Sequence, residues 1–271
     1  MPSNLSSKNK MKKAIITFSF DDARADSYRA IKLAMKYGVK STLNVTTGYV
    51  DNTNKAKENP TYLPAMSKEN VIDLYETGTE IACHGNTHDN KIENILKGKA
   101  KLFEWLQLPD KVSIGFASPH SMIDINTEMI GKMKNNNIVY LRVGPFIKSL
   151  SIAKRLIRKL ATITKSTKLF CYFYRDVIRN PVIDNYILCS IPIMRQNSYL
   201  QLKAIVDAAI ANKSWVILMF HSVLDKGEDG YIENFSWPLG DYKKLCEYIQ
   251  QRNNDIDCLT TIEVFHDMKL D

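Results

Sequence analysis

Residues 13–22 read KAIITFSFDD, an apolar and β-rich run that ends on two aspartates. β-Branched and aromatic residues favour a strand over 13–20. A helical pattern, DSYRAIKLAMKY, follows at 26–37 and is closed by Gly38. A strand followed closely by a helix is the unit from which parallel sheets are built.

The alternation of strand and helix continues along the chain. Further strands are predicted at 40–46, 79–83, 111–116, 138–143, 186–191, 214–220 and 256–259. Helices are predicted at 91–107, 124–135, 199–212 and 240–251, and another begins after Ser67 and ends near Gly78. Seven or eight such units indicate an α/β barrel or a large open sheet. No linker or repeat interrupts them, so we expect a flexible N-terminus over 1–12 and a single domain over 13–271.

Composition excludes several classes of protein. The chain has 271 residues, of which 45% are hydrophobic and 24% charged, and no apolar run reaches the roughly 18 residues of a membrane-spanning helix. Its five cysteines show no CxxC spacing, which argues against a disulfide scaffold or a cysteine-based zinc finger. The N-terminal MPSNLSSKNKMKK lacks the apolar core of a secretory signal, so we expect a cytoplasmic protein.

The positive charge is concentrated in one segment. The chain carries 37 basic and 29 acidic residues, a net charge of +8. Residues 145–180 hold nine basic residues against one acidic residue, so this basic insert accounts for the whole excess. No recognised nucleic-acid motif accompanies the charge, and we therefore expect no nucleic-acid partner.

Part of the basic insert has an amphipathic pattern. Residues 151–160 read SIAKRLIRKL and place Ile152, Leu156 and Leu160 on one helical face. We favour a helix that packs this face on the sheet and leaves its cations in water. Peripheral contact with an anionic membrane is one alternative, and attraction for an acidic glycan or a nucleotide-linked sugar is another.

Polar residues stand where predicted strands end, the edge that carries chemistry in parallel barrels. Asp21 and Asp22 follow the strand over 13–20. Side chains alternate in direction along a strand, so the two carboxylates would point differently unless the chain turns there, and each can have its own task. A single aspartate at such a position would more simply be a helix cap.

The strand over 79–83 is followed by His84 and His88. Four residues apart, the two imidazoles would share one face of a helical turn and could converge on a cation such as zinc. With one carboxylate they would form a three-ligand set that leaves a position open for water, which is typical of catalytic metal sites. The HxxxH spacing alone is a weak signal.

A third strand, over 214–220, ends on His221. Taken alone, a histidine at the end of an apolar strand would more simply be a hydrogen-bonded core residue. However, three predicted strands in this chain end on Asp-Asp, HxxxH and His. A shared site explains this more simply than three independent coincidences.

These stretches resemble the motifs of the polysaccharide deacetylases with a NodB homology domain, carbohydrate esterase family 4. IITFSFDD at 15–22 is similar to the family's T-F-D-D strand, and LMFH at 218–221 to its L-x-x-H. EIACHGNTH at 80–88 is similar to its E-I-x-x-H-[ST]-x-x-H stretch, with Gly85 where serine or threonine is usual. The resemblance extends from about Lys13 to Thr261.

The resemblance implies a deformed (β/α) barrel of about seven strands. It also implies a hydrolase that removes an acyl group, N-acetyl first, from a sugar or a nucleotide- or lipid-linked glycan precursor. Asp22, His84 and His88 would hold one divalent metal ion, zinc first, with cobalt, manganese and nickel as alternatives. Asp21 would be the general base that takes a proton from the activated water, and His221 the general acid that protonates the leaving amine.

The chain departs from the family at GFASPHS, residues 115–121, where R-x-P-[YWF]-G is usual. Ala117 replaces the arginine that would pair with the base, and Arg142, near the end of the strand over 138–143, could supply the same charge from a neighbouring position. The family uses the backbone NH after Pro119 to stabilise the oxyanion, and His120 is a candidate to line the sugar site. The lost arginine leaves a second hypothesis open, a non-catalytic carbohydrate- or partner-binding protein on the same barrel.

Overall fold

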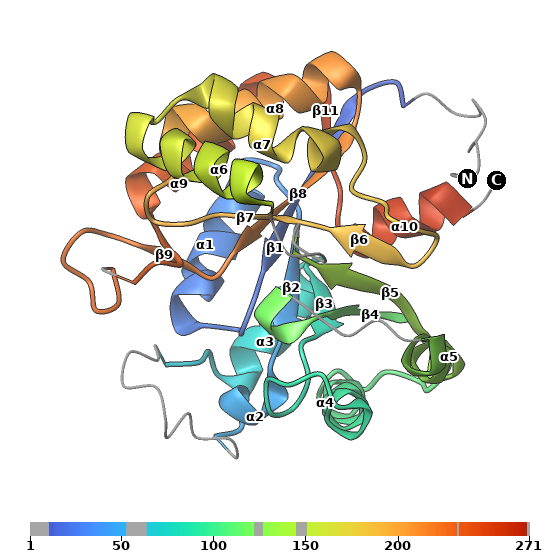
Figure 1. Ribbon diagram of the computed structural model, residues 1–271. Coiled ribbons are helices and arrows are strands. Elements are labelled where there is room, and N and C mark those ends of the chain that lie inside the picture. Colours follow the sequence, from blue (N-terminus) through green and yellow to red (C-terminus); the bar gives the residue numbers. More distant parts are fainter. Residues whose placement is uncertain (1–10, 53–63, 122–126, 145–150, 232, 270–271) are drawn as a thin grey trace.

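A parallel sheet forms the centre of the molecule, with helices around it (Figure 1). The computed structural model describes residues 11–52, 64–121, 127–144, 151–231 and 233–269. The main sheet has nine strands: β1 Ala14–Phe20, β2 Ser41–Val45, β3 Glu80–Cys83, β4 Ile114–Ala117, β5 Ile138–Val143, β6 Ile187–Cys189, β7 Ile191–Pro192, β8 Trp215–Phe220 and β11 Ile256–Cys258. A separate pair joins β9 Ser222–Leu224 and β10 Ser236–Pro238.

The helices follow the strands in sequence. They are α1 Ala25–Lys36, α2 Thr47–Val50, α3 Lys68–Glu76, α4 Ile92–Trp105, α5 Thr127–Asn135, α6 Ile152–Thr164, α7 Thr167–Arg179, α8 Tyr199–Asn212, α9 Leu239–Gln251 and α10 Thr261–Lys269, with a short 3₁₀ turn, η1 Pro119–Ser121. None of the described helices is both long and apolar enough to cross a membrane. The proposed flexible N-terminus lies almost wholly outside the described residues, and the division into domains stays a prediction.

The two ends of the sheet meet, so that it forms a nearly closed barrel. Along the sheet the strand order is β6-β5-β4-β3-β2-β1-β8-β7. Only Ser190 separates β6, which pairs with β5, from β7, which pairs with β8. The single strand predicted over 186–191 therefore bends at Ser190 and serves both edges, which leaves seven strand positions around the barrel. β11 is an additional strand that pairs with β1.

Alternation along β1 decides what faces the barrel interior. Phe18 and Phe20 point outward and pack with Phe220 in the core between sheet and helices, with ring centroids 5.1 and 5.3 Å apart. Thr17 points inward and accepts a hydrogen bond from Trp215 Nε1 at 3.0 Å. Asp21 is in phase with Thr17, and strand periodicity therefore brings its carboxylate into the barrel.

One end of the barrel is closed by apolar side chains. Tyr140, Trp215 and Ile217 form a second buried cluster with Phe265 of α10, and the rings of Tyr140 and Phe265 lie 5.9 Å apart. This plug fills the end at which β8 begins. The hydroxyl of Tyr140 donates to Glu80 at this end, and the candidate site residues lie at the opposite end, where the strands finish.

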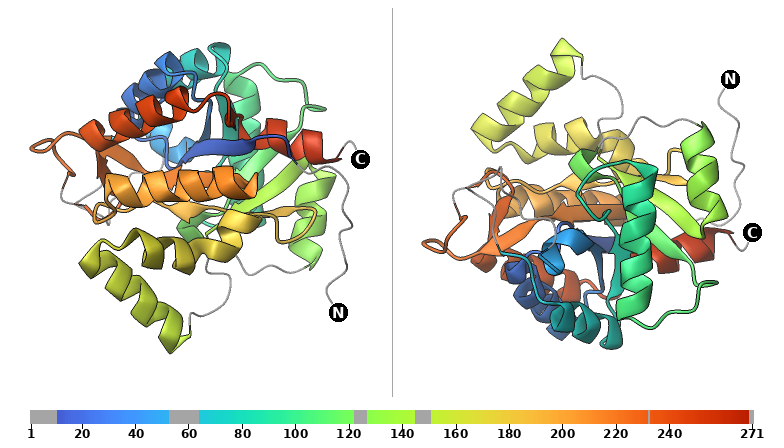
Figure 2. Two further views of the ribbon diagram at one scale, coloured as in Figure 1. Left: turned by 90° about the horizontal axis from the view of Figure 1, so that it is seen from above. Right: turned by 90° about the horizontal axis from the view of Figure 1, so that it is seen from below.

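The helical pair α6–α7 corrects one expectation from the sequence. α6 packs on α7, and α7 packs on α8 and β8, so that α6 is the outlying helix of the pair (Figure 2). The side chains of Ile152 and Leu156 are 83% and 58% exposed. The favoured interpretation, in which the apolar face of residues 151–160 packs on the sheet, is therefore wrong.

A glycine in β4 tests the packing of the barrel interior. A Cβ atom at Gly115 would lie 2.0 Å from Cζ of the buried Tyr140. We expect Gly115→Ala to lower the free energy of unfolding by about 1–3 kcal/mol, the range typical of overpacked cores. Urea denaturation measures the change.

Gly131→Ala is the matched control, because a Cβ there meets nothing within 4 Å in α5. It should raise stability by roughly 0.5–1 kcal/mol through helix propensity. A Gly115→Ala protein as stable as the wild type would contradict the close approach of β4 to Tyr140.

Candidate metal centre and active site

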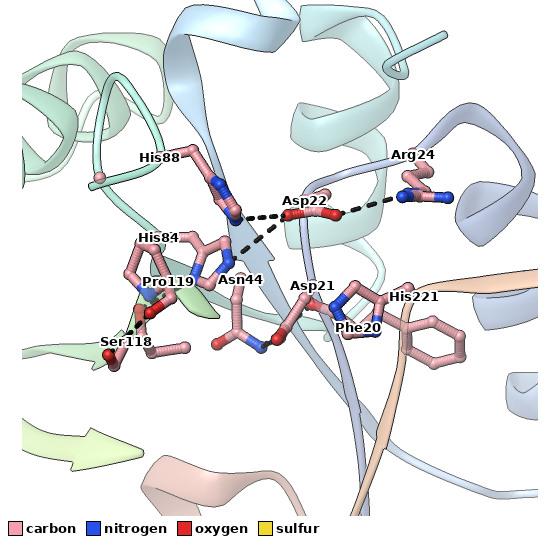
Figure 3. Close-up of polar contacts among 12 residues, drawn as sticks. Phe20, Asp21, Asp22, Arg24, Asn44, His84, His88, Ser118, Pro119 and His221 are labelled. Atoms are coloured by element: carbon pink, nitrogen blue, oxygen red, sulfur yellow. Dashed lines mark hydrogen bonds and ion pairs between the residues drawn. The ribbon is translucent and has the colours of Figure 1, made fainter. Parts of the chain in front are cut away.

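The two aspartates after β1 face different partners. The chain turns at Asp22, where φ is +74°, and at Ala23, where φ is +56°. Asp21 Oδ1 accepts hydrogen bonds from Arg142 Nη2 at 2.6 Å and from Asn44 Nδ2 at 2.8 Å. The Asp22 carboxylate points instead toward two histidines (Figure 3). The chain thus turns at the second aspartate and the two carboxylates have different partners, while their separate tasks stay a prediction.

His84 and His88 converge on one oxygen of Asp22. Their Nε2 atoms lie 3.5 and 3.2 Å from Asp22 Oδ1, and the candidate ligand atoms of the three residues all lie within 4.8 Å of one another. The segment that carries the histidines is not helical, contrary to the expected helical turn. A bend brings the rings together instead, with φ of +80° at Gly85 and +54° at His88.

The structure explains why glycine occupies position 85, where the family usually has serine or threonine. Its positive φ is a conformation that residues with a side chain rarely adopt. Helix α4 also passes very close, because a Cβ on Gly98 would lie 2.8 Å from the carbonyl carbon of Gly85. The two glycines together let α4 support the loop that carries His84 and His88.

The hydrogen bonds around the three residues fit a bound cation. His84 Nδ1 lies 2.8 Å from the carbonyl oxygen of Ala117 and must donate to it, because a carbonyl only accepts. In the neutral ring Nε2 then carries a lone pair, which faces the oxygen of Asp22. Asp22 Oδ1 is buried and accepts no hydrogen bond of good geometry from the described residues, although the two Nε2 atoms lie 3.5 and 3.2 Å away. Two electron-rich atoms buried so close together call for a positive charge between them.

Both aspartates are ionised at neutral pH despite their burial. Burial is the largest single effect and raises the pKa of Asp21, but Arg142 together with His84 and His221 outweighs it, so the pKa lies below its ordinary value. The pKa of Asp22 is held well below its ordinary value by His84 and His88, again against the effect of burial. The Asp22 carboxylate in turn raises the pKa of His88, although burial opposes this.

Arg142 lies where the motif lacks its arginine. Strand register pairs Arg142 of β5 directly with Ala117 of β4, and the guanidinium reaches across to Asp21. Its side chain is 1% exposed and also donates to Ser190 Oγ at 3.2 Å. The structure therefore brings Arg142 and Asp21 together, and the replacement of the missing arginine by Arg142 stays a prediction.

His221 follows β8 and stands beside Asp21. The backbone NH of Asp21 donates to the carbonyl oxygen of Phe220 at 2.9 Å, which fixes the two strand ends side by side. Burial lowers the pKa of His221 to about 4, against the effect of Asp22 and Asp21. Its ring packs on Phe235 with centroids 4.6 Å apart.

Pro119 and His120 lie in η1, at the same end of the barrel. His120 has φ of +59° and ψ of 12°, and its ring centroid is 4.8 Å from that of His88. Its side chain is exposed, while Pro119 is buried. All eight residues singled out from the sequence thus gather at one end of the barrel, although their roles stay predictions.

Two residues of this region were missed in the sequence. Asn44 of β2 donates to Asp21, and Arg24 lies with Nε 3.4 Å from Asp22 Oδ2. Asn44 between Leu43 and Val45, near the end of a predicted strand, was a usable signal. Arg24 gave no signal in the sequence, because the partners that hold it are distant along the chain. It donates to Ser222 at 2.9 Å and to Glu233 at 3.0 Å, some 200 residues away.

The fold and the site together define a class, a (β/α) barrel with a candidate Asp-His-His centre beside a buried Asp–Arg pair. Comparisons with known proteins agree with it. Residues 8–107 match the family model of polysaccharide deacetylases. The crystal structure of a Mycobacterium smegmatis protein assigned to the polysaccharide deacetylases is similar at a TM-score of 0.53 and 12% identity, over 97% of this chain and 92% of that chain.

Two further solved structures are more distant. One is the catalytic domain of a peptidoglycan N-acetylglucosamine deacetylase from Eubacterium rectale, at 15% identity and a TM-score of 0.44, over 96% of this chain and 95% of that chain. The other is a CE4 family pseudoenzyme from Bacillus anthracis, at 12% identity and a TM-score of 0.40, over 78% of this chain and 65% of that chain. No curated protein matches the sequence.

The resemblance to the polysaccharide deacetylases that the motifs indicated is therefore confirmed, and so is the NodB-like barrel. The family match indicates a carbohydrate deacetylase in general terms. The matched family model covers residues 8–107 and assigns neither a substrate nor catalytic residues.

A half-buried carboxyl near the site gives a pH-dependent test of the fold. Asp26 of α1 accepts a hydrogen bond from the Val223 NH at 2.7 Å, and burial raises its pKa from 3.8 to about 6. The folded state thus favours the protonated acid. This stabilising contribution is complete below about pH 4 and is lost as the pH rises through 6.

We therefore expect Asp26→Asn, which keeps an acceptor for Val223 and carries no charge, to gain stability relative to the wild type by about 1 kcal/mol between pH 5 and pH 7.5. Denaturation midpoints of both proteins at the two pH values measure this. A stability difference that does not change with pH would show that Asp26 is not the titrating group.

Proposed function

We propose that this protein is a metal-dependent hydrolase that removes an acyl group, most simply N-acetyl, from a sugar or glycan precursor. The observation that carries the proposal is the buried Oδ1 of Asp22, on which two imidazoles converge and which accepts no well-aligned hydrogen bond from the described residues. The family match supports the carbohydrate as substrate class.

Asp22, His84 and His88 would hold one divalent ion. Two imidazole nitrogens and one carboxylate oxygen suit zinc, and cobalt, manganese and nickel accept the same donors. When bound, such an ion lowers the pKa of water and polarises an acyl carbonyl. The bond from His84 Nδ1 to Ala117 fixes the ring and directs its Nε2 lone pair into the site.

Asp21 would act as the general base. Its side chain is 2% exposed and its carboxylate is ionised and fixed by Arg142 and Asn44, so it can take a proton from the attacking water without first reorienting. Arg142 would be a positioning residue that keeps this carboxylate charged. General-base catalysis of this kind is worth about 10²–10⁴-fold in rate.

His221 would return the proton to the nitrogen that leaves when the C–N bond breaks. With a pKa of about 4 the imidazole is neutral at pH 7, so it can donate only after it has gained a proton. Asp21, whose backbone NH bonds to the residue before His221, is the group that would have accepted one. The proton from water would therefore pass through the Asp21–His221 pair to the amine.

Pro119 and His120 would contact the acyl group and the sugar. The backbone NH of His120 is the candidate to stabilise the developing oxyanion. The exposed imidazole of His120, beside His88, would face the sugar in place of the aromatic ring usual in the family.

The non-catalytic alternative loses its main support. It was suggested by the missing arginine at Ala117, and the register of β4 and β5 places the guanidinium of Arg142 against Asp21 instead.

Substitution of the base separates chemistry from metal binding. We expect Asp21→Asn to retain one equivalent of zinc or cobalt and to lower the rate of acetate release from N-acetyl sugars by about 10²–10⁴-fold, because only the proton acceptor is lost. Metal content and acetate are measured on the same preparation.

Retained metal also reports that the variant is folded. This matters because an unpaired buried Arg142 could cost about 3–5 kcal/mol of stability. Hydrolysis at the full rate by metal-loaded Asp21→Asn would rule out Asp21 as the base.

A further inference from the structure

Helix α6 presents an apolar stripe to solvent. Ile152, Leu156, Leu160 and Ile163 are 83%, 58%, 45% and 66% exposed, and their spacing of four, four and three residues places them on one face. They are four of the ten large apolar side chains that are exposed in the described chain. Scattered single residues of this kind are normal on a surface, but a continuous stripe marks an interaction site.

The stripe is not needed to hold α6 in place. The helix is anchored through another face, where Ala161 is 1% exposed and its carbonyl oxygen accepts a hydrogen bond from Gln201 Nε2 of α8 at 2.9 Å. Beyond this contact α6 packs on α7 and stands out from the body of the protein (Figure 2). Its apolar face therefore has no partner among the described residues.

Cations border the stripe. Arg155 lies three residues after Ile152, and Lys159 lies three after Leu156 and four before Ile163, so both adjoin the apolar side chains. α6 carries four basic residues and no acidic one. Asp176 of α7 is the one acidic residue of the basic insert, and it already lies near Lys154 at 3.9 Å and Arg175 at 3.6 Å.

We propose that α6 docks the protein onto an anionic lipid surface, with the stripe in the acyl–headgroup boundary and the cations on the headgroups. An apolar face bordered by lysine and arginine is the pattern of helices that lie in a membrane interface. A second copy of the chain fits less well, because face-to-face pairing would bring the cations of two helices together with no acids between them. A nucleic acid would leave the stripe in water.

The docked helix also belongs to the end of the barrel that holds the candidate site. α6 follows β5, which finishes next to Arg142, and its anchor Gln201 lies in the first turn of α8. Both features lie at the end where the strands finish. Docking through α6 would bring this end toward the lipid surface. The proposal itself does not depend on the proposed function, because binding can be measured without turnover.

Co-sedimentation of the full chain with vesicles tests the docking. We expect binding to phosphatidylcholine vesicles that contain half phosphatidylglycerol, and at least tenfold weaker binding to phosphatidylcholine alone. Leu156→Glu together with Ile163→Glu should lower binding to the anionic vesicles at least tenfold. The pair Arg155→Gln and Lys159→Gln should lower it about tenfold and weaken its dependence on salt.

Tyr75→Glu on α3 is the matched control, because Tyr75 is also an exposed large apolar residue, at 40%, and lies on another helix. It should bind the vesicles like the wild type, and all variants should keep the wild-type melting temperature because the changed side chains are exposed. Failure of the wild type to bind anionic vesicles would overturn the proposal. So would a wild-type dimer in light scattering that Leu156→Glu dissociates, which would make a second copy the partner.

Discussion

The arrangement of the rest of the site depends on two carboxylates that are buried side by side directly after β1. A buried charge is tolerated only when it is paired. Asp21 is paired with Arg142 across the barrel, and this contact joins β1 to β5 where the sheet closes. Asp22 has Arg24 at one oxygen, while its other oxygen faces the two histidines and accepts no well-aligned hydrogen bond within the described chain. A divalent cation would complete this arrangement.

Much of the fold was readable from the sequence, because its strands carry strong local patterns. β5 and α8 were predicted at their observed bounds, and β1 and α9 to within one residue at each end. The way the barrel closes could not be predicted from local patterns. It depends on a bend at Ser190, which lets the segment before it pair with β5 and the segment after it pair with β8. The helices α2, α7 and α10 were missed, and α10 plugs the barrel through long-range contacts that leave no local pattern.

The sequence identified most residues of the candidate site, but it did not predict the backbone geometry that brings them together. Asp22, His84 and His88 do come together, but through left-handed backbone at Asp22 and His88 rather than through a helical turn. Arg142 was expected to replace the arginine missing at Ala117, and the contact depends on a strand register that the sequence does not state. The face of α6 was misjudged because periodicity shows that a helix has an apolar face but not what covers that face.

Calorimetric titration of zinc into chelator-treated protein is the most direct test of a metal centre formed by Asp22, His84 and His88. We expect the wild type to bind one zinc ion per chain, and we expect the zinc affinity of His84→Ala and of His88→Ala to be at least 100-fold lower. His120→Ala should bind zinc like the wild type, because this ring lies 4.8 Å from His88 but outside the ligand set. Equal zinc affinity in all four proteins, or no zinc bound by the wild type, would contradict a metal centre at the end of this barrel.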